Sequence, residues 1–246
     1  MILKRHFLID VTDRGRQAIL DEVSGSGPQS ARRRERYARV LLPDQAGARI
    51  PGVARREEGV TRPDGIPVGF SAPIAGKEGR LRVTAFVRPE EIARTTSPYD
   101  LLALVTVVSH NACTRALEIA KRQARTSGLL LGVWGSVAAE LYTGLSCTHR
   151  DSDLDLLVAA APRQTLFRFL VAVEALEKSM GLRIDVELDC FNGYGVQLKE
   201  LFGQGRTVLG KSLTDVALLP REQILAELPQ EPPWPIPAAN IGGQHG

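Results

Sequence analysis

The 246-residue sequence has few cysteines and few aromatic residues, and it has no long hydrophobic run. Its three cysteines are an odd number without metal-ligand spacing, which argues against a disulfide framework and a zinc site. We interpret Cys113, Cys147 and Cys190 as buried, reduced side chains, and we therefore expect a cytoplasmic protein. No apolar stretch reaches the roughly 18 residues of a membrane helix. The first residues, MILKRHFLIDV, have Asp10 within a short apolar part, so we expect no secretory signal and no membrane partner.

Hydrophobic residues make up 43% of the chain and charged residues 24%, which is ordinary for one large globular domain or two small ones. The formal net charge is +3, and such a mild surplus is compatible with anionic ligands without selecting among them. Aromatic residues are only 5% of the sequence and rarely alternate with basic ones. Stacking platforms for bases need that alternation, so we expect no nucleic-acid partner.

The pattern changes near residue 90, and we predict a basic α+β domain over residues 1–90. In it, HFLIDV and ARVLLP are expected as strands, with RQAILDEV as a helix between them. RLRVTAFV at 80–87 alternates in part and predicts another strand. A second domain is expected over 91–228. The segment 229–246 is rich in Pro and Gly, which predicts an irregular tail.

In the second domain, Ser97 and Pro98 predict the start of a helix that runs to about Arg125. LLLGVWG then reads as a buried strand and GSVAAELYTG as a helix that ends at Gly144. DLDLLVAAA predicts a second strand, Pro162 opens a long helix, and RIDVELDCF predicts a third strand. Further strands are expected in GYGVQLKELF and TVLGKSL, and a short helix in PREQILAEL.

Two carboxylates in the run SDLDLLV carry the first chemical signal. In a strand, Asp153 and Asp155 project to one side, and Leu154 and Leu156 project to the other. Neighbouring carboxylates repel, and a divalent cation resolves that conflict; Mg²⁺ prefers carboxylate and phosphate oxygens. Taken alone, the same run is also typical of an exposed edge strand with one solvated face.

Two further segments strengthen this interpretation. Gly135 and Ser136 lie between a strand and a helix, where backbone N–H groups favour a phosphate, although a simple helix cap would look the same. In IDVELD, residues Asp185, Glu187 and Asp189 share one strand face, so another carboxylate can reach the same metal site. The ordered combination is much rarer than any one piece, and it indicates metal-dependent transfer of a phosphate-containing group.

The order of Gly-Ser, SDLDLLV and an acidic strand resembles the DNA polymerase β-like nucleotidyltransferase superfamily over about residues 98–212. Compared with many members, the Ser136-to-Asp153 gap is longer and the small basic segment is replaced by YTGLSCTHR. A narrower resemblance is to the malonate decarboxylase holo-acyl-carrier-protein synthases, or phosphoribosyl-dephospho-CoA transferases. It rests on HFLID, IPVGFSAPIAGKEGRLR, VWGS, DSDLDLL, RIDVELDCFNGYGVQLKE and VLGKS. Val186 stands where that family leads us to expect a small residue.

The resemblance implies an α+β nucleotidyltransferase fold, a mixed sheet flanked by helices, preceded by a smaller α+β domain. The implied donor is 2′-(5″-triphosphoribosyl)-3′-dephospho-CoA, and the acceptor is a serine of the apo acyl-carrier subunit of malonate decarboxylase, with release of pyrophosphate. Mg²⁺ or Mn²⁺ would be held by Asp153, Asp155 and a third carboxylate, Glu187 or Asp185. Either of the last two is also a candidate to accept the serine proton.

Basic residues are expected to hold the donor's phosphates: Arg150 and Lys211 are the stronger candidates, and Arg80 and Arg82 the weaker ones. The run ARRRER at 31–36 suits an acidic carrier protein. Solvated surface charge explains each of these equally simply. Trp134 is expected in the core rather than as a stacking platform.

Two other functions remain as alternatives. One is an ATP-using nucleotidyltransferase that acts on a small molecule or protein hydroxyl. The other is a non-catalytic nucleotide-binding module, which has no reason to keep the full carboxylate set.

Overall fold

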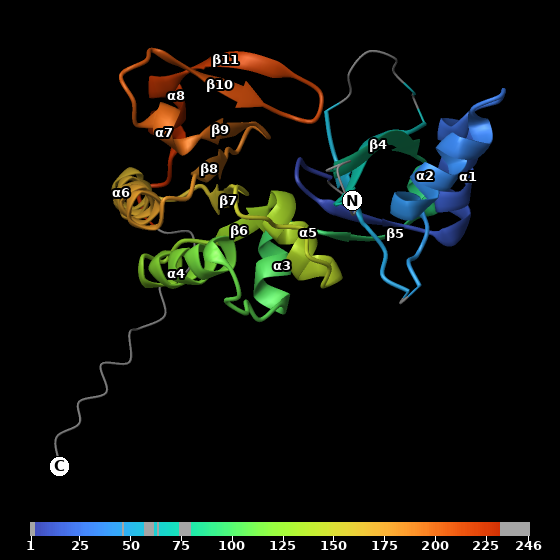
Figure 1. Ribbon diagram of the computed structural model, residues 1–246. Coiled ribbons are helices and arrows are strands. Elements are labelled where there is room, and N and C mark those ends of the chain that lie inside the picture. The colour runs from blue at the N-terminus through green and yellow to red at the C-terminus, as the bar shows by residue number, and fades with distance from the viewer. Residues whose placement is uncertain (1–2, 46, 57–61, 63, 74–79, 232–246) are drawn as a thin grey trace. The chain divides into compact units, whose positions relative to one another are not determined.

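The computed structural model describes residues 3–45, 47–56, 62, 64–73 and 80–231 (Figure 1). The chain divides into two compact units. The first unit comprises Met1–Thr106, Gly132–Ser152 and Lys211–Val216, and the second comprises Val107–Leu131, Asp153–Gly210 and Ala217–Gly246. Among the residues described, no helix is both long and apolar enough to cross a membrane. Helices and sheets are both present, so the predicted α+β class is confirmed.

The first unit is built on a five-stranded sheet in the order β4-β3-β2-β1-β5. Neighbouring strands in it run antiparallel. Helices α1 and α2 pack against β4, and α2 also packs against β3. Apolar side chains of both layers, such as Ile9, Leu20, Val40 and Phe70, form the core between them. The elements are β1 Leu8–Val11, α1 Asp13–Ser24, α2 Ser30–Leu41, β2 Gly52–Ala54, β3 Ile66–Pro73, β4 Arg80–Val87, the 3-10 turn Pro89–Glu91 and β5 Ile92–Thr96.

A buried arginine ties three segments of this unit together. The Arg16 side chain is fully buried, and its guanidinium donates to the carbonyl oxygens of Val11, Leu41 and Ile50 at 3.0, 3.0 and 2.9 Å. Burial is the main cause that lowers the Arg16 pKa. The carbonyl acceptors provide the polar environment that a buried cation requires, so this arginine fixes how α1, the end of α2 and the following loop meet.

The prediction of a strand at ARVLLP was wrong, because this segment forms the end of α2. Read from Tyr37, the half-buried and buried positions of the helix are Tyr37, Ala38, Val40 and Leu41, which is helical spacing. The segment is short enough that its apolar run alone looked like a buried strand. The exposed arginines before it belong to the same helix. The spacing of exposed and buried residues over the whole of α2 indicates a helix rather than a strand.

The second sheet has six strands in the order β11-β10-β9-β8-β7-β6. Strands β7 and β8 are parallel, whereas β8 and β9 are antiparallel, so the sheet is mixed as predicted. The parallel pair needs a crossover connection, and α6 supplies it. The elements are α3 Pro98–Leu104, α4 Ala112–Thr126, β6 Leu131–Trp134, α5 Gly135–Thr143, β7 Leu154–Ala159, α6 Arg163–Met180, β8 Ile184–Asp189, β9 Gly195–Gln197, α7 Leu198–Leu201, β10 Thr207–Lys211, β11 Val216–Pro220 and α8 Arg221–Glu227.

The helix expected from Ser97 to Arg125 is two helices. Ser97 caps α3 as predicted, since its Oγ accepts from the Asp100 N–H at 3.1 Å. A run of β-branched residues after α3 lowers helix propensity. Asn111 then starts α4 with a reciprocal cap in which Thr114 takes part. The two helices carry apolar residues in phase, which is why the sequence pattern looked continuous.

The strands expected in RLRVTAFV, LLLGVWG, DLDLLVAAA and RIDVELDCF are confirmed as β4, β6, β7 and β8, and so is the helix that ends at Gly144, whose φ is +71°. GYGVQLKELF differs from prediction, because a short strand is followed directly by α7. Strands β5 and β11 were not predicted. Of the expected tail 229–246, residues 232–246 lie outside the described part of the chain.

Candidate active site

Four carboxylates come together at the parallel strand pair β7–β8. Asp155 is paired with Asp185, and Leu157 is paired with Glu187. Partners on adjacent strands share a sheet face, and their Cα atoms lie about 5 Å apart; residues two apart in a strand share a face at about 7 Å. Asp153, Asp155, Asp185 and Glu187 therefore stand on one face. Because β7 lies between β8 and β6, the alternative of an exposed edge strand is wrong.

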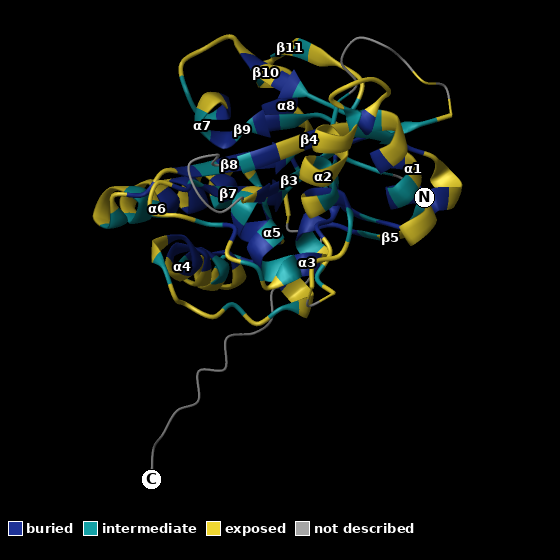
Figure 2. Cartoon of the chain, turned by 45° about the vertical axis from the view of Figure 1, so that its right-hand side comes forward, coloured by how far each residue is buried: buried dark blue, intermediate teal, exposed yellow. Residues whose placement is uncertain are grey.

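Apolar side chains fix the other face of the same strands. Leu154, Leu156, Ile184, Val186 and Leu188 are all at most 1% exposed. Helix α4 packs against β7, and α6 packs against β8. Figure 2 shows both strands largely in the colour of buried residues. The alternation of the two strands thus buries the leucine and isoleucine positions and leaves the carboxylates on the opposite side.

Burial and the neighbouring carboxylates together disfavour the charged form of Asp155. Its pKa is raised from 3.8 to about 7, first by burial and then by the charges of Asp185, Asp153 and Glu187. Glu187 is itself buried, at 3% exposed. A group held near neutrality by its neighbours marks a site that lacks positive charge.

One arginine partly supplies that charge. The guanidinium of Arg183 lies 2.6 Å from an Asp185 oxygen and 3.6 Å from an Asp153 oxygen. The Asp185 charge is the main cause that raises the Arg183 pKa. Arg183 was not among the residues predicted for the site, although its position two residues before Asp185 places it on the acidic face. The signal was therefore present in the alternation of the strand.

In their present positions, the described His, Cys, Asp and Glu side chains form no group of three or more that could hold a metal ion. Arg183 bridges two of the carboxylates instead. The donor set still fits a hard divalent cation by its chemistry, because it offers only carboxylate oxygens. Binding such a cation requires Arg183 to leave Asp153 and Asp185.

The Gly-Ser turn belongs to the first unit. Gly135 has a φ of +70° and begins α5, and Ser136 is half-buried. The preceding Trp134 provides no side-chain cap, and the first turn of α5 contains no acidic residue. An uncapped helix start with a glycine at its head is suited to an anionic ligand.

The basic candidates also lie in the first unit, but they differ in their contacts. Arg80 donates to the Cys147 carbonyl at 2.7 Å and more weakly to the Ser71 hydroxyl at 3.4 Å, so it holds a loop in this structure. Arg82 and Arg150 are exposed. The Lys211 carbonyl accepts from the Arg5 guanidinium at 3.1 Å. The structure thus brings the four acids together within the second unit and the six phosphate candidates within the first.

The loop that leads toward Asp153 is fixed by a residue that the sequence analysis did not consider. Glu140 is 6% exposed, and one of its oxygens accepts from the N–H groups of Cys147 and Thr148 and from the Thr148 hydroxyl, at 2.9, 2.8 and 2.7 Å. A single glutamate in an apolar helix does not by itself predict that its carboxylate binds the backbone of the loop that follows. The three cysteines are free and buried, as predicted.

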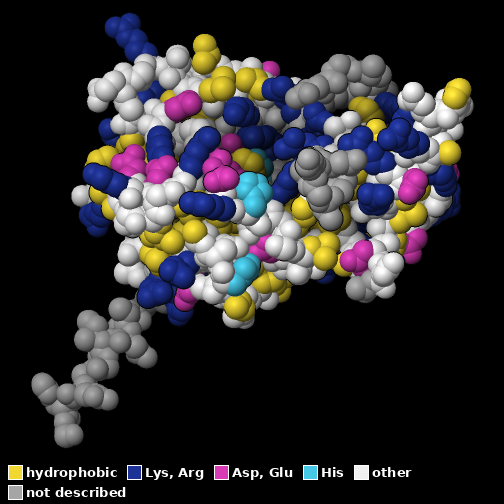
Figure 3. Space-filling model, viewed as in Figure 1, with side chains coloured by type: hydrophobic (Ala, Val, Ile, Leu, Met, Phe, Trp, Pro, Cys, Tyr) yellow, Lys and Arg dark blue, Asp and Glu magenta, His cyan; other side chains and the backbone are white. Residues whose placement is uncertain are grey.

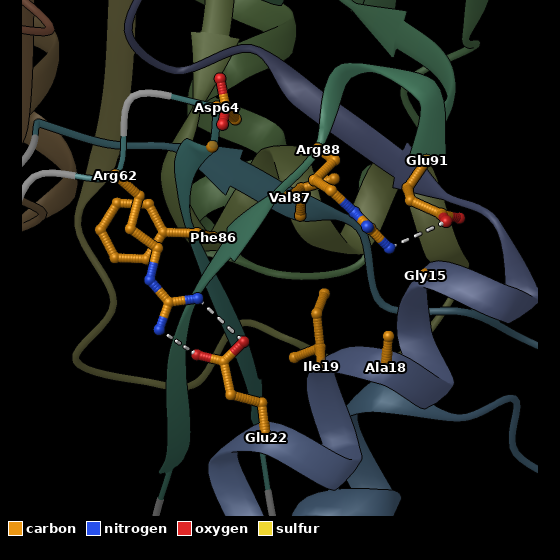
Figure 4. Close-up of a pocket in the computed structure, with 11 residues that line it drawn as sticks. Gly15, Ala18, Ile19, Glu22, Arg62, Asp64, Phe86, Val87, Arg88 and Glu91 are labelled. Atoms are coloured by element: carbon orange, nitrogen blue, oxygen red, sulfur yellow. Dashed lines mark hydrogen bonds and ion pairs between the residues drawn. The ribbon is translucent and has the colours of Figure 1, made fainter.

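The first unit also contains a cavity of about 420 Å³ (Figure 4). Ile19 and Phe86 contribute apolar surface, and Arg62 and Arg88 reach the cavity from its wall. Arg62 pairs with Glu22 at 2.6 Å, and Arg88 pairs with Glu91 at 3.6 Å. Because both cations are neutralised, the cavity is a poor place for a triphosphate. Elsewhere in this unit, Lys and Arg side chains gather over the face shown in Figure 3.

These features define an α+β protein whose candidate site consists of four carboxylates on one face of a mixed sheet. The family model described as "Phosphoribosyl-dephospho-CoA transferase MdcG C-terminal domain" matches residues 101–222, and the corresponding N-terminal domain model matches residues 4–98. The chain belongs to this transferase family, as the sequence resemblance predicted.

Individual relatives agree with the family models. A phosphoribosyl-dephospho-CoA transferase from Xanthomonas axonopodis pv. citri (strain 306) is 35% identical over 186 residues, covering 75% of this chain and 85% of the relative. One from Bradyrhizobium diazoefficiens is 28% identical over 222 residues, covering 90% and 92%. No solved structure gives a significant match.

Proposed function

We propose that this protein transfers the phosphoribosyl-dephospho-CoA group from 2′-(5″-triphosphoribosyl)-3′-dephospho-CoA to a serine of the apo acyl-carrier subunit of malonate decarboxylase. Family membership supports the donor, because its relatives carry the name phosphoribosyl-dephospho-CoA transferase. The observation that carries the chemistry is the pairing of Asp155 with Asp185 in a cluster of four carboxylates. A site of this charge needs cations, and a triphosphate donor is normally bound together with them.

The carboxylates fit Mg²⁺ or Mn²⁺, held by Asp153, Asp155 and either Glu187 or Asp185. When bound, the metal would supply charge neutralisation at the triphosphate and at the leaving pyrophosphate. Arg183, which now pairs with Asp153 and Asp185, would give up these ion pairs to the metal. The raised Asp155 pKa supports this assignment, because a neighbouring cation favours the charged carboxylate that the cluster otherwise disfavours.

The transfer itself balances as a substitution at phosphorus. The serine oxygen forms a bond to the phosphorus attached to the ribose, and the bond breaks between that phosphorus and the oxygen that links it to the second phosphate. The serine proton passes to Asp185 or Glu187, and the electron pair of the broken bond leaves with pyrophosphate. Positioning and charge stabilisation account for most of the rate in such reactions.

The donor's phosphates are assigned to the start of α5, with Gly135 and Ser136, and to basic side chains of the same unit. A glycine with positive φ and an uncapped helix start support the first part. Arg150 and Arg82 are exposed and suited to a long anionic ligand, and Lys211 and Arg80 are half-buried. Arg80 must give up its contact with the Cys147 carbonyl to take part.

We further propose that residues 91–228 form a nucleotidyltransferase fold. This domain follows an N-terminal domain over residues 1–90 and precedes a tail over residues 229–246. The mixed sheet with its crossover helix α6 supports this fold. We also place the protein in the cytoplasm, because its three free, buried cysteines suit a reducing compartment.

The test is to incubate the chain with the apo carrier subunit, the triphosphoribosyl donor and Mg²⁺, and to follow the intact mass of the carrier. A mass gain equal to the phosphoribosyl-dephospho-CoA group, lost when the acceptor serine is replaced by alanine, supports the proposal. Transfer of a nucleotide from ATP, with no use of the dephospho-CoA donor, would favour the alternative of an ATP-using nucleotidyltransferase.

A further inference from the structure

His6 has an unusual backbone conformation. Its φ is +68°, and within the described part of the chain it is the only residue other than glycine with a positive φ. It occupies the third position of a turn in which the Phe7 N–H approaches the Lys4 carbonyl at 3.5 Å. Glycine or asparagine adopts this conformation with less strain. A bulky ring is therefore kept where the backbone favours another residue, which points to a role for the ring.

The His6 ring stacks on Trp134, with ring centroids 3.9 Å apart and planes inclined by 27°. The His6 side of the stack is largely removed from solvent, since His6 is 8% exposed, whereas Trp134 is half-buried. Trp134 is the last residue of β6 and the N-cap of α5, and Gly135 follows it with a φ of +70°. The His6 ring thus contacts Trp134, the residue directly before the first residue of α5.

Two further contacts hold the segment that carries His6. The Ala54 N–H donates to the Phe7 carbonyl at 3.0 Å, which fixes the segment to β2. The Arg5 guanidinium donates to the Lys211 carbonyl at 3.1 Å. His6 lies in the part of the chain matched by the N-terminal family model, whereas Trp134 and Lys211 lie in the part matched by the C-terminal model. All of them belong to the first compact unit.

We propose that His6 is a positioning residue for the donor: through its stack on Trp134, it orients the backbone N–H groups at the start of α5 toward the donor's phosphates. This inference rests on the proposed function, which assigns those phosphates to Gly135 and Ser136. It gives the N-terminal domain a part in donor binding. A purely structural stack lowers stability when it is broken but leaves donor affinity unchanged.

The experiment is a double-mutant cycle on donor binding, measured by calorimetry with triphosphoribosyl-dephospho-CoA in the absence of carrier. His6→Asn relieves the backbone and removes the ring, His6→Phe keeps a ring that can stack, and Trp134→Leu removes the other partner. We expect His6→Asn and Trp134→Leu each to weaken donor affinity about ten-fold, within the coupling found for residues in contact. The double variant should be little worse than either single one, and His6→Phe should remain within about three-fold of the wild type.

The matched control is Phe167→Leu, which breaks the ring pair of Phe167 and Phe202, whose centroids are 5.3 Å apart, in the second unit. It should lower the melting temperature without changing donor affinity. Wild-type donor affinity in folded His6→Asn overturns the inference, and so does an equal loss in His6→Phe, because the stack would then not be the cause. Absence of donor binding by the wild-type chain would instead overturn the proposed function together with this inference.

Discussion

Arg183 lies 2.6 Å from Asp185, on the same strand face as the acid that it neutralises. The same guanidinium lies 3.6 Å from Asp153, so one exposed arginine bridges an acid at the start of β7 and an acid on β8. Asp155 shares a strand face with both acids, and its pKa rises to about 7, first because of burial and then because of the neighbouring carboxylates. An arginine side chain therefore supplies part of the positive charge that this group of carboxylates attracts.

Replacing Arg183 should therefore make the site a better metal site. In Arg183→Gln, no guanidinium competes for Asp153 and Asp185, and we expect Mg²⁺ to bind about ten-fold more tightly, as for loss of one close charge interaction. Titration calorimetry with Mg²⁺ alone measures this. The control is Arg168→Gln on α6, an exposed arginine and an identical change in charge. Equal Mg²⁺ affinity in both variants would contradict the competition.

The raised pKa of Asp155 predicts how the stability of the metal-free protein depends on pH. Between about pH 4 and pH 7, the unfolded chain has lost the Asp155 proton and the folded chain keeps it, so stability falls as the pH rises. The loss is complete above pH 7 and amounts to at most about 4 kcal/mol, at about 1.4 kcal/mol per pKa unit. Asp155→Asn should remove this loss and be the more stable protein at pH 8.

Urea unfolding at pH 5 and pH 8, in the presence of a chelator, measures the effect. The exposed Asp151 provides the control, since Asp151→Asn should keep the wild-type slope. If Asp155→Asn and the wild type lose stability in parallel between these pH values, the carboxylate cluster does not raise the Asp155 pKa. Adding Mg²⁺ should stabilise the wild type more than Asp155→Asn.

The buried guanidinium of Arg16 should be essential for the stability of the first unit. Arg16→Met leaves the carbonyl oxygens of Val11, Leu41 and Ile50 without their donor, and each buried unpaired group costs about 1 kcal/mol or more. We expect a loss of about 3 kcal/mol or more in urea unfolding. Arg14→Met in the same helix, where the side chain is 85% exposed, should cost less than about 1 kcal/mol. Similar losses in both variants would show that the three carbonyl contacts contribute little.

The three acids of β8 should differ in their effect on turnover. Asp185 is paired with Asp155, and Glu187 is one pleat further, whereas Asp189 is paired with Ala159 at the end of the strands. Asp185 and Asp189 lie about 13 Å apart along the strand, too far to serve one metal site. Neutralising Asp185 or Glu187, as Asn or Gln, should lower kcat by at least about 10²-fold. Asp189→Asn should change kcat little. A severe loss of kcat in that variant alone would show that the metals bind at the other end of β8.

Much of the second sheet could be predicted from the sequence because β8 alternates acidic and apolar residues and β6 and β7 are short, mainly apolar runs. Asp153, Asp155, Asp185 and Glu187 were found for the same reason, and their shared face is the direct consequence of strand geometry. The distances between the acids of β7 and those of β8 depend on the register of the two strands. The local sequence pattern of either strand does not determine that register. Placing Asp155 directly beside Asp185 therefore required the structure.

Other features depend on contacts between distant segments and left no local signal. Glu140 is an isolated acid in an apolar helix, and only the folded loop shows that it accepts from Cys147 and Thr148. The stack of His6 on Trp134 joins residues more than a hundred positions apart. The error at ARVLLP had another cause, since the apolar part of α2 is too short for its period to be recognised.

The central claim is that the acidic pair on β7 supports transfer of the donor's phosphoribosyl-dephospho-CoA group to the carrier serine. Its most direct test is the intact mass of the apo carrier subunit after incubation with donor, Mg²⁺ and either the wild-type chain, Asp153→Ala or Asp155→Ala. We predict that the wild type adds the full group, that chelation of Mg²⁺ stops the reaction, and that both variants remain folded yet leave the carrier unmodified. Full modification of the carrier by either folded variant, or by the wild type after thorough chelation, would contradict the account.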